Sequence, residues 1–98
     1  MPLYVIERNF AEQMEFTQEG VEMAKPVIAD AGNNWIFTFL SADKKKAYCL
    51  YESPNPDAIR EAARRLGMPA DVIMEVDEIR PDMFGRSDTL ERPVGERP

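Results

Sequence analysis

The residues of this chain that could do chemistry are carboxylates, phenols and a single thiol, because the sequence contains no histidine. The absence of an imidazole excludes Ser-His and Cys-His nucleophile pairs and His-ligated zinc sites. Glu7 with Glu75 or Asp77 could form a carboxylate pair for acid-base chemistry or cation binding, since adjacent carboxylates raise one pKa. The alternative is that these acids face water at strand ends or pair with Arg8.

Cys49 is the only cysteine, so an intramolecular disulfide is excluded. Its thiol could be a soft metal ligand or a reactive group, but a lone cysteine in a strand is more often a small buried hydrophobe. The first residues carry no basic leader, and no apolar run approaches the roughly 20 residues of a membrane-spanning helix. We therefore expect a cytoplasmic protein without an export signal.

The length of the chain, 98 residues, is that of one domain with one hydrophobic core. A hydrophobic fraction of 44% beside 31% charged residues is typical of a folded globular protein. The net charge of -6 disfavours non-specific attraction to nucleic acid or to an anionic membrane. We expect neither as a partner.

Four segments have the sequence pattern of strands, namely residues 3–8, 35–41, 46–52 and 72–79. Each is rich in β-branched, aromatic or alternating apolar residues. The short charged link between the second and third segments predicts an antiparallel hairpin. In the third segment the alternation leaves open which set of side chains is buried.

Two segments have helical spacing. Between residues 10 and 31 apolar residues recur at three and four positions, with Thr17 as N-cap and Gly32 as the stop, while Pro26 is expected to kink or divide the helix. A second helix begins within residues 53–57, where a cap residue and a proline meet, and ends at Gly67.

The element order βαββαβ predicts an α+β, ferredoxin-like fold. In this fold a four-stranded antiparallel sheet carries both helices on one face. Residues 1–79 are expected to form the single domain. Residues 80–98 are rich in proline and glycine and lack periodicity, which predicts an extended or partly disordered C-terminal tail.

The sheet face that the helices do not cover is expected to carry a row of rings, Trp35, Phe37 and Phe39, at alternate positions of one strand. Monomers rarely expose such a patch, so we predict a homodimer through the open sheet face, of the dimeric α/β-barrel type, with a cavity between the sheets. The predicted ligand-binding residues are Glu7, Trp35, Phe37, Phe39, Cys49 and Tyr51. With the other parity of the third strand, Tyr48, Leu50 and Glu52 would replace Cys49 and Tyr51.

Residues 3–79 resemble a family of small bacterial proteins, domain-of-unknown-function family 4242, one member of which is described as a nickel-binding protein with a ferredoxin-like fold. The resemblance rests on the runs 4–8, 35–43 and 48–65, and is extended by residues 67–71 and 75–76. It implies a ferredoxin-like fold, a dimer and a transition-metal site. Relatives tend to carry a histidine two residues after the tryptophan, where this chain has Phe37. That replacement removes a nitrogen ligand, so we predict no metal ligand here.

Three functions follow from the open face. The leading hypothesis is a small-molecule binding protein, with no cofactor identified. The rival is a cofactor-free oxygenase or isomerase of the dimeric barrel class, in which Glu7, Tyr51 or Glu75 transfers protons. A third possibility is pure assembly, in which the open face buries a partner and leaves no cavity.

Overall fold

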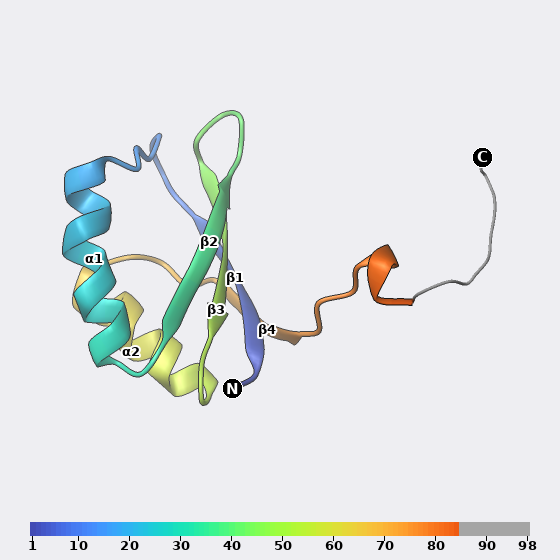
Figure 1. Cartoon of the computed structure of the whole chain (residues 1–98). Helices are drawn as coiled ribbons and strands as arrows, with labels where there is room; N and C mark the ends of the chain where they lie inside the picture. Colours follow the sequence, from blue (N-terminus) through green and yellow to red (C-terminus); the bar gives the residue numbers. More distant parts are fainter. Residues whose placement is uncertain (85–98) are drawn as a thin grey trace.

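Four antiparallel strands form one sheet in the order β2-β3-β1-β4, and both helices lie on one side of it (Figure 1). The computed structural model describes residues 1–84. The strands are β1 (Leu3–Asn9), β2 (Asn34–Leu40), β3 (Lys46–Glu52) and β4 (Val72–Val76). This is the ferredoxin-like α+β fold that the element order predicts. The part of the predicted tail beyond residue 84 lies outside the described residues.

The helices α1 (Gln18–Asp30) and α2 (Pro56–Leu66) begin at side-chain caps. The Thr17 hydroxyl accepts from the Gly20 backbone N–H at 3.0 Å, and the Asn55 amide oxygen accepts from the Ala58 N–H at 2.9 Å. Gly67 ends α2 with a left-handed φ of 65°, which glycine adopts without a Cβ clash. Pro26 does not divide the helix as one of the two expected outcomes had it, because α1 runs through Pro26 as one helix with this residue exposed.

The core lies between the sheet and the two helices. Ile28 of α1 and Ile59 of α2 pack on one face of the sheet, and both are buried. The strand side chains that meet them are Tyr4, Ile6, Cys49 and Tyr51, with Trp35 partly buried beside them. The face opposite the helices has no such cover within residues 1–84.

A β-bulge in β2 changes which residues share a face. Trp35 pairs with Tyr51, but Phe37 pairs with Leu50, the residue immediately before Tyr51. Two steps along β2 therefore correspond to one step along β3, so β2 contains one extra residue between the two rings. An extra residue shifts the alternation by one step. Trp35 therefore faces the helices, whereas Phe37 and Phe39 face the open side. The expectation that all three rings stand in one row is wrong.

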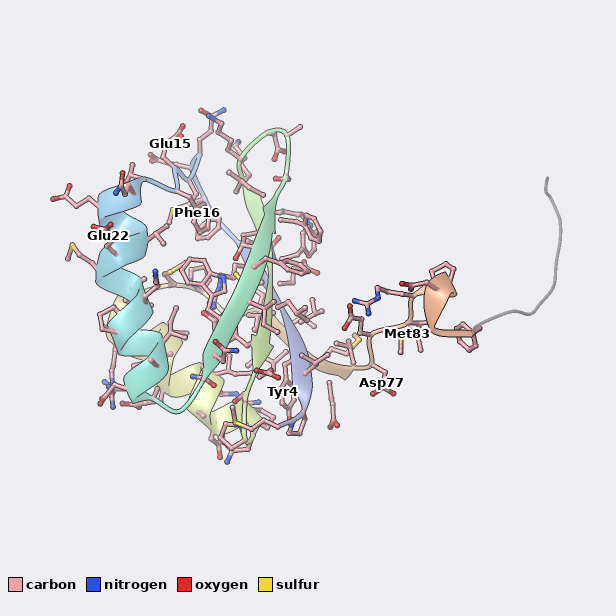
Figure 2. The ribbon with its side chains drawn as sticks, in the orientation of Figure 1. Tyr4, Glu15, Phe16, Glu22, Asp77 and Met83 are labelled. Carbon is pink, nitrogen blue, oxygen red and sulfur yellow. The ribbon has the colours of Figure 1, made fainter. Side chains whose placement is uncertain are left out.

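β4 ends at Val76, three residues before the predicted end of the strand. The chain then leads away from the sheet on the side opposite the helices and forms the short 3-10 helix η1 (Pro81–Phe84) (Figure 1). Asp77 and Met83 lie on this segment, clear of the domain (Figure 2). Residues 77–84 form an arm.

Candidate functional site

The predicted binding residues divide between the two faces of the sheet. Glu7, Phe37 and Phe39 lie on the open face, where Glu7 and Phe39 both pair with Tyr48. The other three, Trp35, Cys49 and Tyr51, lie on the helix-covered face. The structure therefore selects the alternative parity for β3, in which Tyr48, Leu50 and Glu52 face the open side.

The acids that could have formed a carboxylate pair are not brought together. Glu75 pairs with Tyr4 and so shares its face, which is opposite to that of Glu7, and Asp77 lies beyond the end of β4. A carboxylate oxygen of Glu7 lies 3.7 Å from the Lys46 ammonium group. The carboxylate pair predicted for acid-base chemistry or cation binding is therefore not assembled from these side chains.

A cavity of about 90 Å³ lies on the helix-covered side, between α1, the segment that precedes it and the sheet. Backbone hydrogen bonds from Phe10 to Lys45 and from Met14 to Lys44, each 2.8 Å, attach this segment to the β2–β3 turn. Figure 2 shows that Phe16, which belongs to this segment, lies between α1 and the sheet. The cavity wall is mostly apolar, and its apolar side chains include Met14, Phe16, Val21, Ala24, Ile28 and Met68.

Arg8 is the buried charged residue of the cavity wall, and only 2% of it is exposed. One terminal nitrogen of its guanidinium donates to the Pro69 carbonyl at 2.7 Å, and the other donates to the Tyr51 hydroxyl at 3.1 Å. Its Nε donates to the Cys49 sulfur at 3.4 Å. A buried arginine is therefore held in one orientation by uncharged partners.

A chain of hydrogen bonds continues from Arg8 across the wall. The Thr38 hydroxyl donates to the Cys49 sulfur at 3.1 Å and accepts from the Trp35 indole N–H at 2.8 Å. Trp35, Cys49 and Tyr51 were predicted as site residues, and the structure brings these three together at the cavity. Arg8 and Thr38 were missed as site residues. The signal for Arg8 was its parity with Tyr4 and Ile6 in β1.

Tyr51 gives the site a pH-dependent property. Burial raises the pKa of its phenol above the ordinary value of 10.0, although the nearby Arg8 charge lowers it. The folded state thus keeps this proton at a pH where the unfolded state loses it. The resulting contribution to stability is complete below pH 10 and is lost as the pH rises through the folded-state pKa. Tyr51→Phe is expected to lose less stability than the wild type over that range, as measured by urea unfolding.

The control for this prediction is Tyr48→Phe, which removes an exposed phenol from the opposite face. This variant should lose stability above pH 10 as the wild type does. Equal alkaline losses in Tyr51→Phe and the wild type would contradict a buried, proton-retaining Tyr51.

The fold and the cavity define a small ferredoxin-like protein with a mostly apolar pocket, carrying a few polar groups, under its first helix. The chain belongs to the nickel responsive protein SCO4226-like family, whose model matches residues 4–76. A similar solved structure is the crystal structure of SCO4226 from Streptomyces coelicolor A3(2), with 20% sequence identity and a TM-score of 0.62. The match covers 80% of this chain and 99% of that chain, and at this identity it supports the fold alone. No curated protein matches.

The family's description names nickel, a metal that several ligating side chains would have to hold. No group of three or more histidine, cysteine or acidic side chains gathers in the part of the chain that the structure describes. The thiol of Cys49 lies 3.4 Å from the guanidinium of Arg8, whose positive charge opposes a metal cation. These residues do not fit a nickel site. Among residues 1–84, neither helix has the length and apolar character needed to cross a membrane.

Proposed function

We propose that the protein binds a small molecule in the cavity between α1 and the sheet. The observation that carries this proposal is an open volume of about 90 Å³ against the core of so small a domain. Protein interiors are close-packed, and voids larger than a water molecule are few. Ligand pockets are mostly apolar with a few converging polar groups, as here. The sequence had favoured a cavity on the open face instead.

The polar side chains of the cavity support its use as a binding site, as opposed to a void left by imperfect packing of the core. Arg8, Tyr51 and Cys49 meet at one side of the cavity, and each is fixed by the hydrogen bonds described above. Groups held in this way would orient a ligand without further ordering of side chains on binding. The surrounding apolar side chains would exclude water from the bound molecule.

Ala24→Leu is the variant that tests binding, because Ala24 lines the cavity and a leucine there would fill it. Native mass spectrometry of untagged protein is expected to show a retained small molecule in the wild type and at least about tenfold less of it in Ala24→Leu. Ala29→Leu makes the same change on an exposed part of α1 and should retain the molecule. A crystal structure in which the protein's own side chains fill the volume would contradict the proposal.

We also propose that the open sheet face pairs with a second copy of the chain. Phe37 and Phe39 lie there with ring centroids 5.1 Å apart, and Tyr48 and Met74 are exposed on the same face. Isologous dimers are the commonest way to cover such an apolar surface. The arm supports this proposal, because it leads away on that side with exposed apolar side chains, namely Ile79, Met83 and Phe84.

A further inference from the structure

The unusual feature of the cavity is the charge of Arg8, which has no acidic partner among residues 1–84. Its three observed partners are a carbonyl, a hydroxyl and a sulfur atom. Within residues 1–84, the carboxylates that lie within 4.0 Å of an arginine or lysine nitrogen pair with residues other than Arg8. A buried charge without an opposite charge is costly, so proteins normally pair it.

Glu15 is the acidic residue of the cavity wall, but its carboxylate pairs with a lysine at the surface. It lies 3.0 Å from the Lys44 ammonium group, and 64% of the Glu15 side chain is exposed. Its pairing with Lys44 satisfies both charges at the surface. The positive charge of Arg8 is therefore available to a negatively charged group that enters the cavity.

We propose that the ligand is a small organic anion, a monocarboxylate with a compact apolar body. This inference rests on the proposed binding function and assigns the chemical class of its ligand. A guanidinium carries five N–H donors, and the observed bonds use one on each of its three nitrogens. The two remaining N–H groups match the two oxygens of a carboxylate.

The rest of the wall accounts for the apolar body. Phe16, Val21 and Ile28 line the cavity and offer no charge or side-chain hydrogen bond to a ligand. A phosphate or sulfate would leave several oxygens against this apolar surface, which is unfavourable. Since one water needs about 10–15 Å³, a volume of about 90 Å³ holds a ligand of about six to nine non-hydrogen atoms.

Benzoate is a suitable probe, with benzamide as its uncharged analogue of the same shape. Trp35 is the only tryptophan and lines the cavity, so its fluorescence reports binding directly. We expect benzoate to bind the wild type at least about tenfold more tightly than benzamide, since hydrogen bonds to charged groups are the stronger ones. Arg8→Met, which replaces the charge by an apolar chain, should abolish this preference, and Arg8→Lys should retain part of it.

The outcomes separate this inference from the function on which it rests. Benzamide binding as tightly as benzoate would overturn the anion and leave the small-molecule site intact. Inorganic phosphate competing as well as benzoate would overturn the organic class. If neither probe binds the wild type or Ala29→Leu any better than Ala24→Leu, and native mass spectrometry shows no small molecule retained by the wild type, the cavity is not a binding site and both proposals fail. Because the benzoate and benzamide comparison uses the wild type, it decides the question even if Arg8→Met does not fold.

Discussion

Replacing Ile59 by alanine is expected to lower the free energy of unfolding by about 2–5 kcal/mol. Ile59 has 0% exposure and belongs to the cluster that joins α2 to the sheet. Removing its outer carbons loses apolar burial and leaves a void that rigid neighbours fill only in part. For a domain whose whole stability is about 5–15 kcal/mol, this is a large fraction. Urea or thermal unfolding followed by circular dichroism measures it.

The matched control is Ile36→Ala, which makes the same change at an exposed position of β2. Its cost should be at most about 1 kcal/mol, because exposed side chains give up little burial. Similar losses at the two positions would contradict the placement of Ile59 in the core. Cys49 and Tyr51 belong to the same cluster, so Ile59→Ala should also weaken ligand retention.

The sequence predicted the fold well because its elements are bounded by residues with strong local preferences. Thr17 and Asn55 cap the helices, and Gly67 ends α2 where its positive φ is needed. Each acts through a few neighbouring backbone groups, so its effect does not depend on distant packing. β3 was predicted with its observed bounds, Lys46–Glu52, because a charged turn precedes it and a proline-rich cap follows.

The candidate site was predicted only in part, because it depends on pairings between distant segments. A bulge such as the one between Trp35 and Phe37 is set by the register of β2 against β3, and the alternating pattern of β2 does not reveal it. Because Trp35 was assigned to the open face, the residues of β3 beside it were assigned to that face as well, although they face the helices. The cavity of the single chain lies on the helix-covered side, whereas the predicted cavity lies between the open faces of two copies.

Arg8 was considered only as a partner for acids because arginine is rarely buried. Its burial depends on contacts with two residues far along the chain. These are the carbonyl of Pro69 and the ring of Tyr51, whose centroid lies 5.9 Å from the guanidinium carbon. No local pattern in β1 encodes those contacts. Parity with Tyr4 and Ile6 was the one available indication that its side chain points toward the helices.

Phe39→Glu is expected to convert the proposed dimer into a monomer. Phe39 is 65% exposed in the single chain and lies at the apolar open face. At the core of a sheet-to-sheet interface, a carboxylate would lose its water without gaining a partner, and the two-fold symmetry would bring in a second one. The dimer dissociation constant should rise at least about 100-fold, as measured by light scattering across a dilution series.

Met23→Glu is the control for this prediction, because it places the same charge at an exposed position of α1, on the far side of the sheet. It should remain dimeric. A wild type that is monomeric at every concentration would refute the dimer, as would a Phe39→Glu variant that stays dimeric. The cavity lies on the face opposite Phe39, so monomeric Phe39→Glu should still bind benzoate. Loss of binding together with dimerisation would instead show that the second copy helps to hold the cavity in shape.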